Sequence, residues 1–351
     1  MNRWIGGPLF DAGFFFGGAL AALAAGLAML AAPASVLPLW FAWLLLIEGP
    51  HLCATWQRTY LNAAWRRERP ALLWGSLLWL LPGPLLLLVS RISGQAEPFL
   101  LFLGAVALWS FHHAVRQHHG ILAIYQRLNG AAAGARGADK RLLHGIMWGA
   151  FALFLVAHPA NGIGAALGSY GSAIAVAIAS ALAAAVLAWA VLLWQRWRQG
   201  EALLPGMFGL VVAAGTTLFA LLVVGMREPL LAHPLTLEQV FLAAAIVSGT
   251  LHGVQYLGIV IATERRSKAS AGRRAAPLAA YAAMVAVSLG YVWLNLARGG
   301  APVGAAPQSL SAQVFLALYW GLFCHHFWLD QKIWRPSTDA RLRAELGLEA
   351  A

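Results

Sequence analysis

The sequence predicts an all-α, polytopic transmembrane helical bundle of about ten spans. Of its 351 residues, 60% are hydrophobic and only 11% are charged, whereas a soluble domain carries roughly 25% charged residues. Apolar stretches recur along the whole chain, each of roughly 20 residues, which is the length that an α-helix needs to cross the bilayer core. These stretches are continuous rather than alternating, so they indicate helices and not the strands of a β-barrel.

The predicted spans are separated by short loops, and no polar stretch is long enough to enclose a soluble core. We therefore predict a single transmembrane helical domain over residues 1–335 and a short cytoplasmic tail over residues 336–351. The ten spans are expected at residues 10–32, 36–57, 71–91, 98–126, 141–160, 170–195, 204–225, 237–263, 276–297 and 309–334.

The basic residues predict the orientation of the chain. The formal net charge is +11, which in a soluble protein would suggest a nucleic-acid partner. Here 20 of the 24 Lys and Arg residues fall on one side of the membrane if the N-terminus is cytoplasmic. The outer loops hold Arg91, Arg227 and Arg298, and Arg116 lies inside a span. The positive-inside rule then places both termini in the cytoplasm, and we expect a multi-pass protein of a bacterial inner (cytoplasmic) membrane with no nucleic-acid partner.

Histidines gather toward the cytoplasmic ends of the predicted spans. Nine of the eleven histidines lie there, whereas His158 and His233 lie toward the opposite side. A common depth for nine histidines from five separate stretches favours a shared site over scattered structural histidines. The nine are His51, His112, His113, His118, His119, His144, His252, His325 and His326.

Helical spacing, at about 100° per residue, ranks these histidines. In the stretch SFHHAVRQHHG, His112 and His119 share a face with Arg116, and His118 points away from it. The histidines expected to converge on one cavity are His51, His112, His119, His252 and His326. A second rank consists of His113, His144 and His325. Those expected to lie outside the site are His118, His158 and His233.

Two carboxylates inside predicted spans, Glu48 and Asp330, are expected to belong to the same site. A carboxylate in the bilayer core costs a few kcal/mol, so it usually faces a partner or a wet cavity. Glu48 and His51 have the Glu-x-x-His spacing that di-iron carboxylate bundles use, although Pro50 should distort that turn. Asp330 follows His326 by one helical turn and either binds a metal or holds an imidazole through its second N–H.

The ligand supply points to a transition-metal site. Neutral imidazoles suit iron, copper and zinc. About eight imidazoles with one or two carboxylates exceed what one ion needs, which favours two ions, iron before copper or zinc, or one ion with proton-handling groups. Cys53 and Cys324 offer no thiolate cluster for an iron–sulfur or cysteine-type zinc site. The competing interpretation pairs the carboxylates with Arg116 or Lys332.

The stretches HHAVRQHHG and CHHFWLD resemble the histidine-rich sites of integral-membrane non-haem di-iron oxygenases, namely the desaturases, fatty-acid hydroxylases and alkane hydroxylases. The resemblance covers the logic of the site and not the whole chain, because the order of the histidine motifs and the number of spans differ. It implies O₂ activation at non-haem iron, a lipid-like substrate, and electrons supplied by a separate donor. The carotenoid-cleaving dioxygenases, also histidine-iron membrane enzymes, are similar in the same way.

Two other functions remain open at this stage. A membrane redox protein would hold haem between paired histidines and use quinol as its substrate. A transporter for metal ions or protons would use the histidines as a relay, but it predicts polar groups that continue to the outer side, where only His158, His233 and Glu238 are available. All of these functions share the lipid bilayer as a partner. An oxygenase would also bind a hydrophobic small molecule.

Overall fold

The computed structural model describes residues 3–226, 237–267, 282, 285–286, 289 and 310–349, and every regular element in these ranges is helical. The predicted all-α class is therefore confirmed. In the first part of the chain the elements are α1 (Pro8–Asp11), η1 (Ala12–Phe16), α2 (Gly17–Ala31), η2 (Pro33–Ser35), α3 (Val36–Trp43), η3 (Leu44–Glu48), α4 (Gly49–Arg58), α5 (Ala63–Glu68), α6 (Pro70–Ser76), η4 (Leu77–Leu80), α7 (Pro82–Ser93) and α8 (Glu97–Leu128), where η marks a 3₁₀ or π-helical turn. The later elements are α9 (Ala133–Ala157), η5 (Pro159–Asn161), α10 (Ile163–Ala166), α11 (Tyr170–Arg198), α12 (Leu204–Met207), η6 (Phe208–Ala214), α13 (Gly215–Leu218), η7 (Phe219–Val224), α15 (Leu237–Arg266), α17 (Leu310–Ile333) and α18 (Ala340–Glu345).

Eight helical segments of the described chain are long and apolar enough to cross a membrane, and they indicate an integral, multi-pass membrane protein. Most of the ninth predicted span, residues 276–297, lies outside the described residues. The tenth forms α17, whose 24 residues are long enough to span, but its polar side chains make it less apolar than the other eight. Those eight are Pro8–Ala31, Pro33–Arg58, Pro70–Ser93, Glu97–Leu128, Ala133–Ala157, Tyr170–Arg198, Leu204–Val224 and Gln239–Arg266.

The chain divides into two compact units. The first comprises Met1–Trp43, Val115–Ala262 and Leu346–Ala351, and the second comprises Leu44–Ala114 and Thr263–Glu345. The divisions at Ala114 and Ala262 fall inside α8 and α15, so each of these helices contributes residues to both units. The expectation of one transmembrane domain over residues 1–335 stays a prediction.

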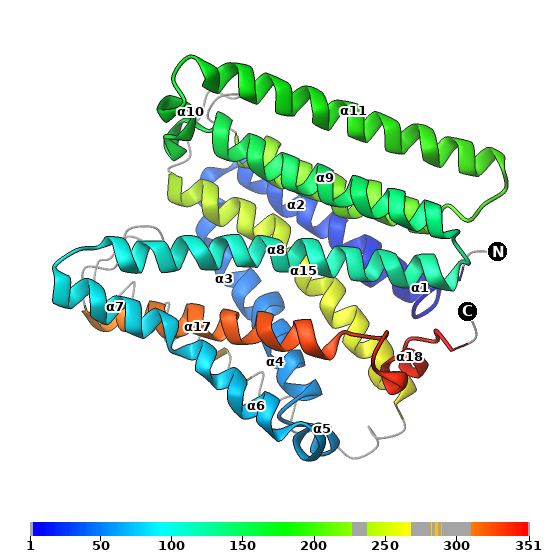
Figure 1. The fold of residues 1–351 in the computed structure, drawn as a ribbon, viewed down its shortest axis with the longest axis horizontal. Helices are drawn as coiled ribbons and strands as arrows, with labels where there is room; N and C mark the ends of the chain where they lie inside the picture. The colour runs from blue at the N-terminus through cyan, green and yellow to red at the C-terminus, as the bar shows by residue number, and fades with distance from the viewer. Residues whose placement is uncertain are drawn as a thin grey trace. The chain divides into compact units, whose positions relative to one another are not determined.

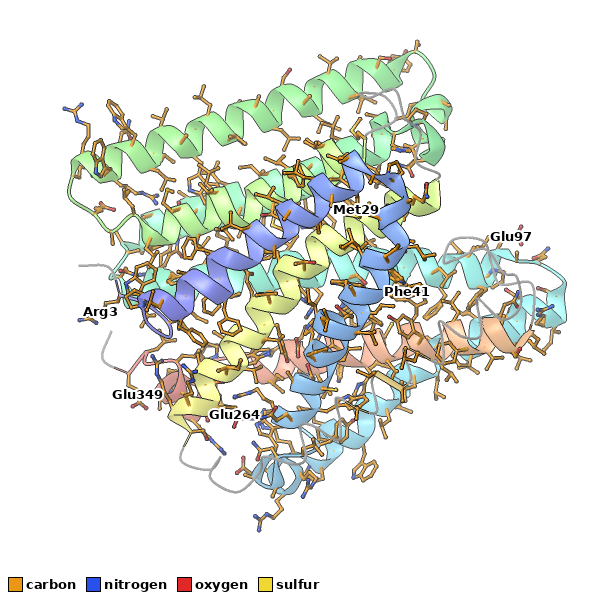
Figure 2. All side chains as sticks on the ribbon, turned by 180° about the vertical axis from the view of Figure 1, so that it is seen from behind. Arg3, Met29, Phe41, Glu97, Glu264 and Glu349 are labelled. Atoms are coloured by element: carbon orange, nitrogen blue, oxygen red, sulfur yellow. The ribbon has the colours of Figure 1, made fainter. Side chains whose placement is uncertain are left out.

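In the first unit, α9 and α11 run side by side (Figure 1). Buried Asp139 of α9 accepts hydrogen bonds from Trp189 Nε1 at 3.0 Å and from the Arg196 guanidinium at 2.9 Å to each carboxylate oxygen. A charge buried in a low-dielectric interior needs such a partner. Elsewhere on α11, apolar side chains such as Leu187 are exposed, and Figure 2 shows side chains projecting along the length of this helix. That surface suits contact with lipid.

In the second unit, α17 packs closely against α7 (Figure 1) and η4. Two glycines make this close contact possible. A Cβ atom at Gly83 would lie 2.5 Å from the carbonyl oxygen of Ala317. A Cβ atom at Gly321 would lie 3.0 Å from the carbonyl oxygen of Leu80. Glycine therefore permits the close approach that fixes α17, the helix that carries His325 and His326.

The helix that carries His51 begins at a local distortion. Residues Leu44–Glu48 form the π-helical turn η3, and α4 then starts at Gly49 with Pro50 in its first turn. Proline is tolerated there because the first N–H groups of a helix have no intrahelical acceptor. The predicted distortion at Pro50 is present, and π-helical turns of this kind are frequent at functional sites.

The C-terminal segment of the second unit is folded against other parts of that unit. Arg58, at the end of α4, is buried, and its guanidinium donates to Glu345 Oε2 of α18 at 3.0 Å and to Thr263 Oγ1 at 2.7 Å. The same guanidinium lies over the Trp334 ring, 4.6 Å from its centroid. Arg58 is therefore part of a buried ion pair, in addition to being one of the basic residues that predicted the orientation.

The long helix α8 allows a direct test of topology. It begins just after the turn at Gly94 and ends just before the turn at Gly130, and both glycines have positive φ values in loops. Because α8 is long and apolar enough to cross the bilayer once, we expect topology reporters inserted at Gly94 and Gly130 to report opposite sides, with Gly130 cytoplasmic. Reporter activity and cysteine accessibility in intact cells measure this. A common side for both positions would contradict the predicted threading.

Candidate metal centre

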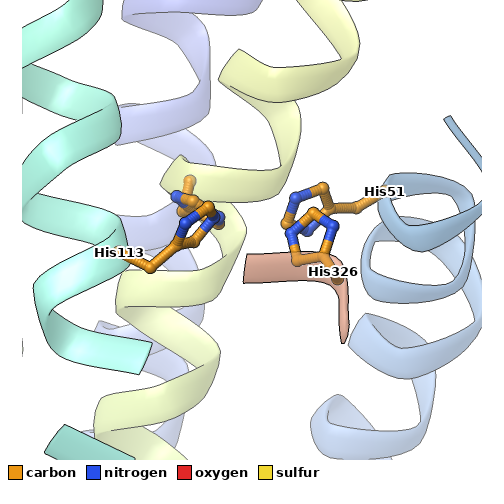
Figure 3. Close-up of side chains that lie close together, drawn as sticks. His51, His113 and His326 are labelled. Carbon is orange, nitrogen blue, oxygen red and sulfur yellow. The ribbon is translucent and has the colours of Figure 1, made fainter. Parts of the chain in front are cut away.

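Three buried histidines of the second unit converge from three helices. His51 comes from α4, His113 from α8 and His326 from α17. Each offers one ring nitrogen, and these nitrogen atoms lie within 4.8 Å of one another. Figure 3 shows the three rings reaching toward one another from their separate helices. The group has the donor atoms and the convergence that a metal ion requires.

The rings meet edge to face and not as a stack. The centroids of His51 and His326 are 4.4 Å apart with an interplanar angle of 89°, and those of His113 and His326 are 5.1 Å apart at 73°. Nitrogen ligands at 2.0–2.1 Å from one ion lie roughly 3–4 Å apart. A bound ion would therefore draw the most widely separated of these nitrogens together by about 1–2 Å.

Two buried carboxylates border the imidazoles. Asp330 Oδ2 lies 3.6 Å from His113 Nε2 and 3.6 Å from His326 Nε2. Glu48 Oε2 lies 3.6 Å from His51 Nδ1. Charge-assisted hydrogen bonds are shorter, at about 2.7–2.9 Å, so these contacts are too long to be direct imidazolium–carboxylate bonds. Donor atoms that share one metal ion have separations close to these.

A threonine links two of these groups. Thr55 is fully buried on α4, one helical turn beyond His51. Its Oγ1 lies 2.8 Å from His326 Nδ1 and 3.1 Å from Asp330 Oδ1. Glu48, His51 and Thr55 have the spacing that puts residues on one face of a helix, and this spacing is the signal that could have identified Thr55. It was nevertheless missing from the predicted site.

On α8, the two adjacent histidines have different surroundings. His113 joins the group, whereas the side chain of His112 is exposed. The prediction put His112 on the inner face because it shares that face with Arg116 and His119. The Arg116 side chain is itself exposed, so the shared polar face does not mark the interior at this point, and the ranking of His112 above His113 as a metal ligand stays a prediction.

His325 has a different partner from its neighbour His326. Its Nε2 lies 2.9 Å from the hydroxyl of Tyr60, and the two rings stack with centroids 5.6 Å apart. Tyr60 also donates to the carbonyl of Leu73 and contacts Ser76 Oγ at 2.8 Å. Burial raises the pKa of the Tyr60 phenol, while the hydrogen bond with Ser76 lowers it. Tyr60 is thus a hydrogen-bonding partner of His325 and Ser76 in this unit.

The remaining candidate histidines lie in the first unit. His119 of α8 and His144 of α9 face each other with ring centroids 5.2 Å apart. His252, buried on α15, lies 6.4 Å from His118 between centroids, and His118 Nδ1 is 2.9 Å from Gln255 Oε1. The assignment of His119, His144 and His252 as metal ligands stays a prediction.

Besides His118, two histidines were predicted to lie outside the site, and the structure describes one of them. His158 is buried at the C-terminal end of α9, and His233 lies outside the described residues. Among the basic residues considered as carboxylate partners, Lys332 lies over the Trp328 ring, 4.4 Å from its centroid. Asp330, in contrast, lies 3.6 Å from the imidazole nitrogens of His113 and His326.

No protein-family model, curated protein or solved structure matches this chain.

Proposed function

We propose that the protein is an integral-membrane metalloenzyme, an O₂-activating oxygenase, hydroxylase or desaturase that acts on a lipid-like or other hydrophobic substrate. Its metal would be held by His51, His113 and His326 with Asp330 beside them. The observation that supports this proposal most is the convergence of three buried imidazoles next to a buried carboxylate in an apolar helical protein.

Charge balance favours a metal at this position. Glu48 and Asp330 are both buried, and neutral imidazoles offer no charge to compensate ionised carboxylates. Direct imidazolium–carboxylate bonds would be shorter than the 3.6 Å separations. A divalent cation at this position would bind the convergent nitrogen atoms and offset the negative charge of the neighbouring carboxylates.

The donor set favours iron, although copper and zinc also accept imidazoles. Histidines combined with a carboxylate are the ligands of non-haem iron oxygenases. When bound, an iron ion would supply the redox chemistry that activates O₂. The chain's own residues would bind and orient that ion and surround it with apolar side chains, and the bilayer would deliver the hydrophobic substrate. Electrons would come from a separate donor on the cytoplasmic side of a bacterial inner membrane.

Three imidazoles and Asp330 supply four donor atoms, which complete a tetrahedral shell for one ion. The second ion expected from the sequence would need ligands in addition to these four. The number of ions per chain therefore remains a prediction that a measurement can decide.

The first test is metal content. We expect one or two transition-metal ions per chain, most of them iron, in protein purified gently in detergent. Elemental analysis of a monodisperse, helical sample measures the stoichiometry, and an optical spectrum of the same sample identifies haem if a Soret band is present. A folded sample that contains no stoichiometric metal and takes up none would contradict the proposal, and a Soret band would replace it with the haem reading.

A further inference from the structure

We infer that Thr55 is a positioning residue that orients two metal ligands with one hydroxyl group. It sets His326 in the tautomer that presents Nε2 to the metal, and it holds Asp330 so that Oδ2 is the binding oxygen. This inference rests on the proposed metal site and goes beyond it by assigning the binding atoms and the residue that selects them.

The argument follows from the single proton of a hydroxyl group. Thr55 Oγ1 has one proton to donate and lone pairs to accept. A carboxylate that binds a metal is ionised and can only accept, so in the proposed site the 3.1 Å contact with Asp330 Oδ1 uses the Thr55 proton. The 2.8 Å contact with His326 Nδ1 can then be a hydrogen bond only if Nδ1 carries a proton and donates it to Oγ1. Both bonds form together in this arrangement alone.

The tautomer of His326 follows directly. A neutral imidazole carries one N–H, so a proton on Nδ1 leaves the lone pair on Nε2. A ring nitrogen must present a lone pair to bind a metal, and the hydrogen bond of the other nitrogen decides which one does so. His326 Nε2 is also the atom that lies 3.6 Å from Asp330 Oδ2, so the selected nitrogen points toward the selected oxygen.

Asp330 is oriented by the same contact. Its Oδ1 accepts from Thr55, while its Oδ2 lies 3.6 Å from the Nε2 atoms of both His113 and His326. Ligands at about 2.1 Å in a tetrahedral shell are about 3.4 Å apart. The two 3.6 Å separations are close to that value, so Asp330 is placed to bind through one oxygen. An Asp330 that instead held an imidazole N–H would lie at hydrogen-bond distance from it.

The position of Thr55 makes the hydroxyl effective. The side chain is fully buried, so no bulk water competes for either hydrogen bond. Threonine is β-branched and stiff at χ1, which limits the directions that Oγ1 can take on α4. Valine has nearly the same shape without the hydroxyl, and serine keeps the hydroxyl without the methyl group. These two substitutions separate the hydrogen bonds from the packing.

The test uses Co²⁺ titration of the full-length protein after metal removal in detergent. Loss of an outer hydrogen-bonding partner typically weakens metal binding 10–100-fold, so we expect Thr55→Val to weaken Co²⁺ binding by that order and to change the ligand-field absorption bands. Thr55→Ser should retain affinity within about a factor of a few and restore the spectrum. A chelator competition assay measures the affinity, and circular dichroism checks the helical fold.

The outcomes distinguish the inference from the proposed function. If the parent protein binds no Co²⁺, the metal site itself is wrong. If the parent binds Co²⁺ and Thr55→Val does so with the same affinity and spectrum, Thr55 does not position the ligands. Equal losses in Thr55→Ser and Thr55→Val would assign the effect to packing and also overturn the inference. If Thr55→Val does not fold, Thr55→Ala removes the same hydroxyl without added bulk and decides the matter in the same way.

Discussion

Replacing His113 by alanine is expected to weaken metal binding more than about 100-fold, beyond the loss typical of an outer-shell partner. His113 supplies one of the three convergent nitrogens, and its Nε2 lies 3.6 Å from Asp330 Oδ2. Its removal leaves His51, His326 and Asp330 as an incomplete shell. Metal per chain after gentle purification, and Co²⁺ affinity after metal removal, both measure the loss.

The matched control is the neighbouring residue. His112 is exposed on α8, so His112→Ala removes the same chemical group one position away and should leave metal content unchanged. The pair also tests the face of α8 that the structure assigns to the site. Metal loss in His112→Ala with retention in His113→Ala would restore the face predicted from sequence and contradict the three-histidine site.

The fold could be predicted well because membrane solvation constrains the sequence strongly. Long apolar runs leave helices as the simplest way to satisfy the backbone in lipid, and eight of the predicted spans are present as helices that meet the requirements for crossing a membrane. The common depth of the histidines rests on a related argument and stays a prediction. Positive loops set the expected orientation, which would bring residues near the cytoplasmic ends of different spans to a similar level.

The helix faces could not be predicted in the same way. His112 and His113 differ by about 100° around α8, and the packing of neighbouring helices decides which of them points inward. The sequence indicated a polar face containing Arg116, yet that side chain is exposed. Packing also assigned His325 to Tyr60 and His326 to Thr55, because adjacent residues on one helix meet different neighbours.

Arg58 illustrates a second limit. Sequence position alone made it one of several basic residues at a cytoplasmic helix end, but Glu345, far along the chain, converts it into a buried ion pair. No local pattern joins α4 to α18. The pairing exists because the C-terminal segment folds back, and its energetic importance can be measured separately from the metal site.

Replacing Glu345 by alanine is expected to lower the free energy of unfolding by about 3–5 kcal/mol, the loss typical when one partner of a buried ion pair is removed. The Arg58 and Glu345 side chains are only 10% and 7% exposed, and their charged groups are 3.0 Å apart. Without the carboxylate, the buried guanidinium of Arg58 loses its nearest anion. Equilibrium unfolding by denaturant in detergent micelles measures the change.

Two comparisons make this expectation specific to the buried pair. Arg69→Ala removes one side of the more exposed Arg69–Asp339 pair, which has a 4.0 Å separation, and should cost at most about 1 kcal/mol. Arg58→Met combined with Glu345→Ala should be more stable than Glu345→Ala alone, because no unpaired charge remains buried. If Glu345→Ala lowers the free energy of unfolding no more than Arg69→Ala does, Arg58 does not depend on Glu345. Water, or the more distant carboxylate of Glu264 at 3.9 Å from Arg58, would then be sufficient to stabilise the charge of Arg58.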